Sequence, residues 1–346
     1  MKFLLTAINA KFIHSNPAIY SLRAGVGEKL QPYVELAEFT INESPESILE
    51  GIWKRQPKVI GFSCYIWNWK LIREILTELP KILPDTEIWL GGPEVTYDGP
   101  GLLREFPQVT GIMVGEGEVT FREVLDHYVR EAESTGQSEQ QPEPDSIEQQ
   151  AADRTGTVAG KSVEERFGQI PGLCLASGYT APRELTDLTT LPFLYEDMEP
   201  FTNRIIYYET SRGCPYRCSY CLSSIDKKVR LRDIDVVKRE LQFFLDQNVK
   251  QVKFIDRTFN CDHKHAMEIW RYIYEHDNGV TNFHFEISAD ILREEEIALL
   301  NRFRPGLAQL EIGVQSTNPE TIRAIHRVMD VDKLEKMLFP IQAGYA

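Results

Sequence analysis

Short apolar segments alternate with amphipathic segments along the first 130 residues of this chain. The apolar segments that suit β-strands are KFLLTAI, VELAEF, KVIGFSC, EIWLGG and TGIMVG. The segments between them, such as SPESILEGIWKRQ and WKLIREILTELPKIL, repeat their apolar residues at the spacing of an α-helix. Strands that alternate with helices in this way indicate a parallel sheet with helices on both faces. We therefore predict that residues 1–130 form a doubly wound, Rossmann-like α/β domain.

A second series of strand and helix candidates occupies residues 205–346. Its strand candidates are RIIYYET, VKQVKFID, NFHFEIS and LAQLEIGVQS, and a helical pattern follows each of them. Repeated βα units of this length are typical of a parallel barrel or part of one. In such a barrel the functional loops lie at the carboxyl ends of the strands, so we expect the chemistry there.

The segment between the two series has a different composition. Between residues 131 and 166 there is no aromatic residue, and the large aliphatic residues are only Ile147, Val158 and Val163. Such a segment buries too little apolar surface to offset the entropy that its ordering would cost. We predict a flexible polar insertion over residues 131–168, followed over residues 169–204 by a hairpin with Cys174 and a connector.

Charge and cysteine content narrow the class of protein. The chain has 38 basic and 52 acidic residues and a formal net charge of −14, which argues against general binding to nucleic acid or to an anionic membrane. No apolar run approaches the roughly 20 residues that span a bilayer, and the N-terminal run suits a first strand better than a signal peptide. Six cysteines, half of them clustered, do not have the pattern of a disulfide framework, so we expect a reducing cytoplasm.

Three cysteines lie within eight residues, in the stretch TSRGCPYRCSYCLSS directly after the first strand of the second series. Thiolates at this spacing, from Cys214, Cys218 and Cys221, can bind zinc or an iron–sulfur cluster. A structural zinc site needs four ligands, and no fourth ligand lies close by in the sequence. This pattern favours a cluster with one open iron, and an open position indicates a catalytic rather than a structural site.

A separate metal site is an alternative. Cys261, His263 and His265, in NCDHKHAM, could bind a metal by themselves. The competing interpretation, which we prefer, is that these residues begin a helix that Asn260 or Asp262 caps.

The C-x3-C-x2-C spacing, with the aromatic Tyr220 before the last cysteine and a barrel strand before the first, resembles the radical S-adenosylmethionine (SAM) superfamily. The resemblance implies that Cys214, Cys218 and Cys221 hold a four-iron four-sulfur (4Fe-4S) cluster and that SAM chelates its open iron. It also implies reductive cleavage of SAM, which releases methionine and a 5′-deoxyadenosyl radical that abstracts a hydrogen atom from the substrate.

By the same resemblance, residues at the strand ends are expected to contact SAM. Asp256 lies where the family contacts the methionine amino group, and Glu286 and Gln315 lie near the positions for the ribose and methionine moieties. Arg327 follows where an arginine often binds the carboxylate, and Tyr220 belongs to the cysteine motif itself.

Radical SAM barrels usually have six βα units, whereas four fit within residues 205–346. We therefore expect an incomplete (β/α) barrel, a partial TIM barrel, with an exposed apolar edge at its fourth strand. The chain is then a fragment or a split product, or a second polypeptide completes the barrel.

The loops after the predicted strands of the first domain are rich in glycine and aromatic residues. They contain the stretches NAKFIHSNPAIY, CYIWNW, GGPEVTYDG and GEGEVTF. Glycine lets the backbone approach a ligand closely, and doubly wound sheets bind ligands beyond the carboxyl ends of their strands. Four such loops on one edge favour a large planar ligand.

A Rossmann-like domain with these loops ahead of a radical SAM barrel resembles the cobalamin-binding (B12-binding) radical SAM proteins over most of the chain. The resemblance implies cobalamin on this edge, without the lower axial histidine of a D-x-H-x-x-G motif, which the chain lacks. His14 is a candidate replacement for that histidine, and a role in orienting its own loop is the alternative. The residues expected to face the corrin are Asn9, His14, Tyr65, Trp67, Gly91, Gly92, Glu116 and Gly117.

The commonest reaction of the resembled class is methyl transfer to an unactivated carbon or phosphorus, and other radical rearrangements also occur in it. We expect a small-molecule substrate and a reductant such as flavodoxin or ferredoxin. One alternative is a radical SAM tRNA methylthiotransferase, which would need three further cysteines in a domain that here has only Cys64. A non-catalytic iron–sulfur or corrinoid-binding protein is the other.

Overall fold

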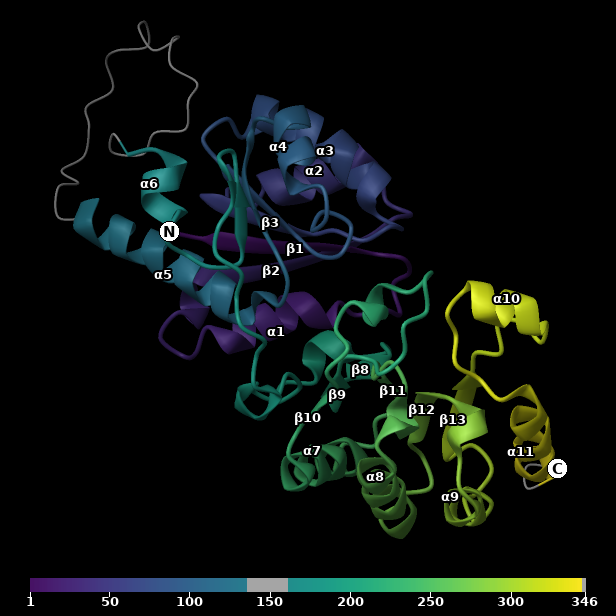
Figure 1. The fold of residues 1–346 in the computed structure, drawn as a ribbon. Coiled ribbons are helices and arrows are strands. Elements are labelled where there is room, and N and C mark those ends of the chain that lie inside the picture. Colours follow the sequence, from purple (N-terminus) through teal and green to yellow (C-terminus); the bar gives the residue numbers. More distant parts are fainter. Residues whose placement is uncertain (136–160, 344–346) are drawn as a thin grey trace, which may run out of the picture. The chain divides into compact units, whose positions relative to one another are not determined.

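The computed structural model describes residues 1–135 and 161–343 (Figure 1). The chain divides into two compact units. Unit 1 comprises residues 1–186 and 192–197, and unit 2 comprises residues 187–191 and 198–346. The first predicted series of strands therefore belongs to unit 1 and the second to unit 2.

A seven-stranded sheet forms the centre of unit 1, with the strand order β2-β1-β3-β4-β5-β6-β7. Five of its strands are parallel: β1 (Phe3–Asn9), β2 (Val34–Thr40), β3 (Val59–Ser63), β4 (Glu87–Gly91) and β5 (Val109–Met113). The predicted hairpin adds β6 (Leu173–Leu175) and β7 (Gly178–Tyr179) in antiparallel orientation. The doubly wound, Rossmann-like domain is confirmed, and the hairpin with Cys174 extends its sheet.

Helices cover both faces of this sheet. Every residue of β1 is buried, because its side chains point alternately into two cores. Phe3 and Leu5 pack with α1 (Pro17–Gly25) and α5 (Gly117–Thr135). Leu4 and Ile8 pack on the other face with helices α2 (Pro45–Trp53), α3 (Trp69–Ile82) and α4 (Gly99–Glu105). The parallel strands therefore carry near-continuous apolar runs, as a sheet buried on both faces requires.

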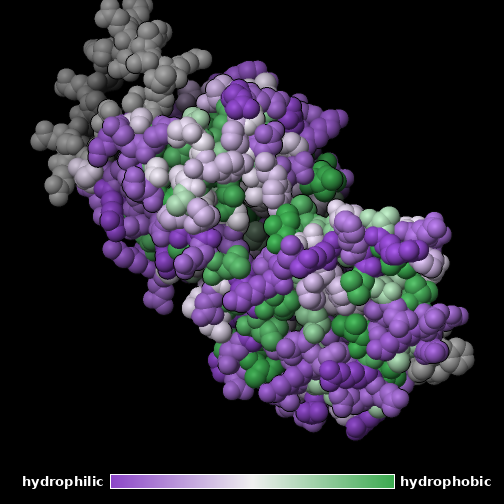
Figure 2. Space-filling model, viewed as in Figure 1, coloured by the Kyte–Doolittle hydropathy of each residue, from purple (hydrophilic) through white to green (hydrophobic). Residues whose placement is uncertain are grey.

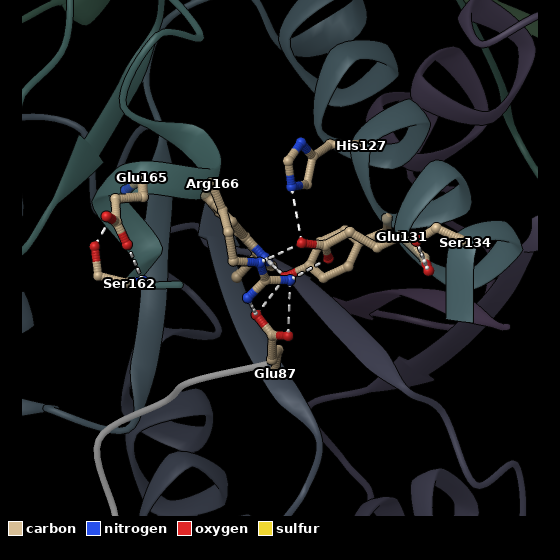
Figure 3. Close-up of polar contacts among 9 residues, drawn as sticks. Glu87, His127, Glu131, Ser134, Ser162, Glu165 and Arg166 are labelled. Carbon is tan, nitrogen blue, oxygen red and sulfur yellow. Dashed lines mark hydrogen bonds and ion pairs between the residues drawn. The ribbon is translucent and has the colours of Figure 1, made fainter. Parts of the chain in front are cut away.

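The predicted flexible insertion over residues 131–168 is wrong at both of its ends. Helix α5 continues to Thr135, and α6 (Val163–Phe167) begins after a Ser162 cap. Figure 3 shows the guanidinium of Arg166 between Glu87 and Glu131, and the Arg166 side chain is only 1% exposed. The prediction counted only apolar residues, so it missed α6, which the ion pairs of Arg166 help to hold in place. Residues 136–160 of the predicted insertion lie outside the described residues.

A four-stranded parallel sheet forms the centre of unit 2, in the order β13-β12-β11-β8. Its strands are β8 (Ile206–Tyr208), β11 (Gln251–Phe254), β12 (Asn282–Ile287) and β13 (Ala308–Ile312). The helices α7 (Ile234–Asp246), α8 (His263–Glu275) and α9 (Glu294–Leu300) lie side by side along it (Figure 1). Aromatic rings fill the core, since the ring centroid of Phe285 lies 4.5 Å from that of Phe254 and 6.1 Å from that of Trp270. The predicted incomplete barrel is confirmed.

Strand β13 is an edge strand, because within the described part of the chain it pairs only with β12. Its exposed side chains are those of Gln309 and Glu311, whereas Leu310 and Ile312 are half-buried. The expectation of an exposed apolar edge is therefore wrong, because the exposed side chains of β13 are polar or charged. Polar and charged side chains on an edge strand disfavour pairing with other chains.

Unit 2 also contains a two-stranded ribbon and two C-terminal helices. A ribbon of β9 (Ser211–Arg212) and β10 (Arg230–Leu231) is antiparallel, and the helices α10 (Pro319–Ala324) and α11 (Val331–Ala343) follow β13.

On the face drawn in Figure 2, hydrophilic residues predominate and hydrophobic ones form smaller patches. Within residues 1–135 and 161–343, no helix combines the length and the apolar character that crossing a membrane requires.

Candidate functional site

The three-cysteine stretch forms a loop at the carboxyl end of β8. The β9–β10 ribbon closes this loop, and the backbone N–H of Cys214 donates a hydrogen bond of 2.9 Å to the carbonyl oxygen of Asp226. Gly213 permits the closure, because its φ is +94° and a Cβ there would lie 2.4 Å from the carbonyl oxygen of Lys228. We call residues 213–229 the cysteine loop.

The three thiols of the cysteine loop are free, with Cys214 and Cys218 buried and Cys221 half-buried. Among the described residues, no three His, Cys, Asp or Glu side chains gather closely enough to hold one metal ion. The ligands of a zinc ion converge on a single point, whereas the cysteines of an iron–sulfur cluster bind different irons and stand further apart. That the cysteine loop binds an iron–sulfur cluster stays a prediction.

Cys261 is a further sulfur beside this loop. It ends the 3₁₀ turn η6 (Phe259–Cys261) after β11, and Thr258 Oγ1, at the start of that turn, lies 3.6 Å from Cys214 Sγ. Burial, and after it the charges of Cys214 and Asp256, raise the pKa of the Cys261 thiol to about 11. In the metal-free chain, Cys261 is therefore a neutral thiol at neutral pH.

The alternative metal site at Cys261, His263 and His265 is not assembled. Asp262 caps helix α8, because its Oδ1 accepts a hydrogen bond of 2.9 Å from the backbone N–H of His265. His263 Nδ1 lies 2.9 Å from Glu296 Oε1 instead of facing a metal. The preferred interpretation of a helix start is confirmed, with Asp262 rather than Asn260 as the cap.

Asp256 fastens the start of the cysteine loop to the end of β11. Its carboxylate is fully buried and accepts hydrogen bonds of 2.6 Å from the hydroxyls of Thr210 and Ser211, and one of 3.0 Å from the backbone N–H of Thr210. Burial raises the pKa of Asp256 to about 6, although these bonds favour the carboxylate. Asp256 thus lies beside the cysteine loop, as its expected role requires, and its contact with SAM stays a prediction.

Replacing Asp256 with asparagine is expected to remove a pH dependence of stability. The folded-state pKa of about 6 exceeds the ordinary value of 3.8, so the folded state binds this proton more tightly than the unfolded state does. The resulting stabilisation is complete below pH ~4 and is lost as the pH rises through ~6, a change of roughly 3 kcal/mol. Hydrogen–deuterium exchange would measure opening free energies of the β8 and β11 amides across this range. The same slope in the Asp256→Asn variant would contradict the prediction.

Tyr220 and Arg327 meet, although 107 residues separate them in the chain. Arg327 Nη1 donates a hydrogen bond of 3.3 Å to the Tyr220 hydroxyl, and Nη2 donates one of 2.5 Å to the carbonyl oxygen of Gly313. The backbone N–H of Ser219 donates a bond of 2.9 Å to the carbonyl oxygen of Ile325. These contacts bind the cysteine loop to the segment after β13, so Arg327 lies at the predicted site with its guanidinium already engaged by the chain.

Glu286 and Gln315 lie apart from this pair. Gln315 is exposed beyond β13, with a left-handed φ of 64°. Burial raises the pKa of Glu286 on β12 against the lowering effect of Arg257 and Lys253, and Lys253 Nζ lies 3.8 Å from it. Whether Glu286 and Gln315 touch SAM stays a prediction.

The sequence analysis missed a polar group beside Glu286. Glu311 Oε2 lies 3.0 Å from both Lys253 Nζ and His284 Nε2. These residues alternate along their strands with the aromatic residues Phe254, Phe283 and Phe285 of the core. Strand alternation was therefore the signal that could have revealed a polar face on this sheet.

The carboxyl ends of the strands of unit 1 carry exposed apolar side chains. Tyr65 and Trp67 stack at 4.4 Å with an angle of 9° between their rings, and Trp67 is 47% exposed. Other large side chains that are exposed in these loops are Phe12, Ile13, Ile41, Ile66 and Tyr97. Solvent-facing apolar groups gathered at the ends of several strands mark a binding surface, and their chemistry fits a large flat apolar group such as a corrin.

Polar residues and glycines shape this edge. Asn9 is buried and its Nδ2 donates to the carbonyl oxygen of His14 at 3.0 Å and to Glu38 Oε1 at 2.8 Å. Gly92 has a φ of +110°, and a Cβ there would lie 2.5 Å from the carbonyl oxygen of Cys64. These contacts set the loops after β1, β3 and β4, and the imidazole of His14 keeps its predicted role as a proposal.

The remaining predicted corrin-facing residues lie at the ends of β4 and β5. Gly91 ends β4, where a Cβ would lie 3.8 Å from the Cβ and the carbonyl oxygen of Met113, and Gly117 begins α5. Glu116 Oε2 accepts a hydrogen bond of 2.7 Å from the backbone N–H of Thr186. All eight predicted residues therefore lie in loops or strand ends at the carboxyl side of the sheet, and their contact with cobalamin stays a prediction.

Two family models match the chain. The model of the B12 binding domain matches residues 4–125, and the model of the Radical SAM superfamily matches residues 208–338. The first match covers β2, β3, β4, β5 and all but the first residue of β1, and the second covers the cysteine loop with β11, β12 and β13.

Curated relatives are similar over part of the chain. The 2-(S-pantetheinyl)-carbapenam-3-carboxylate methyltransferase of Streptantibioticus cattleyicolor is 26% identical over 234 residues, which are 63% of this chain and 30% of that protein. The cobalamin-dependent radical SAM methyltransferase TokK of Streptomyces tokunonensis is 28% identical over 215 residues, which are 59% of this chain and 28% of that protein. The chain thus matches about a third of the length of these relatives.

A solved structure shares the fold. The radical S-adenosylmethionine methyltransferase TsrM from Kitasatospora setae, with cobalamin and a [4Fe-4S] cluster bound, is similar with a TM-score of 0.67 at 17% identity. The match covers 100% of this chain and 65% of that one. The likeness bears on the fold and does not by itself carry over the reaction.

Proposed function

The chain belongs to the radical SAM proteins that carry a B12-binding domain, and from this premise we propose that it is a cobalamin-dependent radical SAM methyltransferase. The proposed reaction is methyl transfer to an unactivated carbon, or to phosphorus, of a small-molecule substrate. A cytoplasmic setting and a reductant such as flavodoxin or ferredoxin would suit this chemistry.

One observation carries this proposal. The cysteine loop, with Cys214, Cys218 and Cys221, lies at the carboxyl end of the first strand of a parallel sheet, within residues 208–338 that the Radical SAM superfamily model matches. This arrangement supports a cluster with an open iron, and the apolar strand-end loops of unit 1 support a corrin in the same chain. Neither feature alone would separate the proposed enzyme from a simple carrier.

The chain's own residues would position the two groups. When bound, the cluster with SAM supplies radical chemistry and cobalamin supplies a methyl carrier. Cys214, Cys218 and Cys221 would hold the cluster, and Asp256 would accept a hydrogen bond from the methionine amino group of SAM. In unit 1, Tyr65 and Trp67 would cover the corrin and exclude water from it.

Four further residues would complete the SAM site. Tyr220 would contact SAM from the cysteine loop, and Arg327 would bind its carboxylate. Glu286 and Gln315 would bind its ribose and methionine moieties. Because Arg327 already contacts Tyr220 and Gly313, SAM would need to share or replace these hydrogen bonds.

A methylthiotransferase is the less favoured function. Such an enzyme would need a second cluster, and the cysteines outside unit 2 are Cys64 and Cys174, both fully buried in the core of unit 1. Burial raises the pKa of Cys64 far above its ordinary value, so its thiolate is strongly disfavoured. Two thiols in a packed core do not provide the ligands of a second cluster.

Anaerobic reconstitution tests the proposed function against a carrier role. The chain is loaded with iron and sulfide, mixed with hydroxocobalamin and SAM, and reduced with dithionite. An enzyme should release 5′-deoxyadenosine or S-adenosylhomocysteine, and the corrin absorbance should shift on binding. Stable iron–sulfur and corrin spectra without any product from SAM would instead favour a carrier.

A further inference from the structure

The cysteine loop and its flanks carry an excess of basic side chains in an acidic chain. Residues 212–232 include six basic residues and one acidic residue, although the whole chain has a net charge of −14. Three of the basic residues have carboxylate partners: Arg212 with Glu209 at 2.9 Å, Arg230 with Asp226 at 2.8 Å and Arg232 with Glu240 at 2.7 Å. The unbalanced charge therefore resides on the other three, which we call the basic patch: Arg217, Lys227 and Lys228.

All three side chains of the basic patch are exposed. Within the part of the chain that the structure describes, no ion pair neutralises any of them. Closure of the loop brings the basic patch near the predicted cluster ligands. The backbone N–H of Cys214 donates a hydrogen bond to the carbonyl oxygen of Asp226, and Gly213 lies against the carbonyl oxygen of Lys228. Three unpaired cations on one loop make a local positive field on an acidic molecule.

Apolar side chains are exposed on the same loop. Leu222 and Ile225 are 56% and 57% exposed. Apolar residues bordered by charged ones are the usual composition of a protein–protein interface. Interfaces of transient electron-transfer complexes are small, so a single loop is a sufficient size for one.

We propose that the basic patch and these apolar residues dock an acidic one-electron carrier protein that reduces the cluster. The inference rests on the proposed function, because reductive cleavage of SAM consumes an electron that must come from outside the chain. One electron leaves the reduced flavin or iron–sulfur group of the carrier and enters the cluster, and no bond forms or breaks in this step. Opposite charges accelerate the encounter and orient the carrier. The half-buried Cys221 brings a ligand sulfur toward the surface of the same loop.

A binding measurement with purified flavodoxin, an acidic carrier, tests the docking surface directly. The Lys227→Glu/Lys228→Glu variant reverses two charges of the patch. The matched control, Arg239→Glu/Lys250→Glu, reverses two exposed charges on α7 and before β11. At low salt we expect the patch variant to bind at least about tenfold more weakly than the parent chain, and the difference should shrink as salt screens the charges. The control should stay within about twofold of the parent, as expected for charges outside the interface.

Formation of 5′-deoxyadenosine gives a second readout. With dithionite, a small reductant that needs no docking, the parent and both variants should react at equal rates. With flavodoxin, only the patch variant should slow, by about tenfold. The milder Lys227→Gln/Lys228→Gln variant should slow by an intermediate amount. An intermediate rate would mean that the loss follows the charge and does not come from a folding defect in the charge-reversed variant.

The outcomes separate the two proposals. If dithionite supports no SAM cleavage by the parent chain, the proposed function fails, and the binding arm still decides the docking surface. Unchanged flavodoxin affinity in the patch variant, or equal weakening in the control, would overturn the docking proposal. Salt-dependent binding of a short RNA that the patch variant abolishes, with flavodoxin binding unaffected, would assign the patch to nucleic acid instead.

Discussion

The Cys218→Ala variant is expected to lose the iron–sulfur absorbance of the reconstituted chain and to release no 5′-deoxyadenosine above background. Cys218 is buried within a loop that the β9–β10 ribbon closes, so another sulfur cannot replace it without opening the loop. Removing a residue that only supports a metal ligand typically costs about 10–100-fold in affinity or activity, and removing a ligand should cost more. Iron content per chain and product formation measure the loss, and circular dichroism checks that the variant is folded.

Cys261→Ala is the matched control for this prediction. Cys261 lies near Cys214 and Asp256, and in the metal-free chain burial raises the pKa of its thiol to about 11. If the three cysteines of the loop hold the cluster by themselves, Cys261→Ala should keep full iron content and product formation. Loss of the cluster in Cys261→Ala would mean that a fourth cysteine closes the iron site, and the proposed binding of SAM to an open iron would then be wrong.

Local sequence patterns were sufficient for the strands of both sheets. The spacing of Cys214, Cys218 and Cys221 is also a local property, and their role as cluster ligands stays a prediction. The strands of unit 1 were equally visible, because burial on both faces gives each of them a continuous apolar run. The same holds for the start of α8, where the short polar side chain of Asp262 bonds to a backbone N–H three residues later.

Contacts between distant parts of the chain were not predictable in this way. The β9–β10 ribbon is only two residues long on each side, and its pairing depends on the positive φ of Gly213. The hydrogen bond between Tyr220 and Arg327 joins residues whose distance in sequence gives no signal. The resemblance to the radical SAM superfamily suggested contacts of Tyr220 and Arg327 with SAM, whereas the structure reveals that they also bond to each other.

The Arg166→Ala variant is expected to destabilise unit 1 by about 3–5 kcal/mol. Arg166 donates four hydrogen bonds of 2.8–3.1 Å, two to Glu87 and two to Glu131 (Figure 3). Its guanidinium also lies over the ring of Phe167 at 4.7 Å. Removing Arg166 would leave Glu87 with the Tyr128 hydroxyl and Glu131 with His127 as the partners that remain, and both carboxylates are partly buried. The loss of one member of a buried ion pair costs more than the net value of the pair. Urea unfolding followed by tryptophan fluorescence reports on unit 1, which holds Trp89 beside this network.

Arg130→Ala provides the control on the same helix, α5. Arg130 pairs with Asp126 at 2.6 Å, but its side chain is 76% exposed, so we expect a loss of at most about 1 kcal/mol. Equal effects of Arg130→Ala and Arg166→Ala would contradict the assignment of the large effect to buried charge. Equal effects would also mean that the ion pairs of Arg166 do not explain why α6 packs against unit 1.

The pH dependence of this defect and a triple variant identify its origin. Burial alone would raise the pKa of Glu131, and the hydrogen bonds and charge of Arg166 hold it below the ordinary value of 4.5. The ion pair thus stabilises the chain above about pH 4.5 and loses its effect as the pH falls, so the Arg166→Ala defect should shrink in acid. For the same reason, Arg166→Met combined with Glu87→Gln and Glu131→Gln should recover much of the lost stability, because no buried charge then lacks a partner. If the triple variant were less stable than Arg166→Ala alone, the geometry of the network rather than its charge would hold α6 against the sheet.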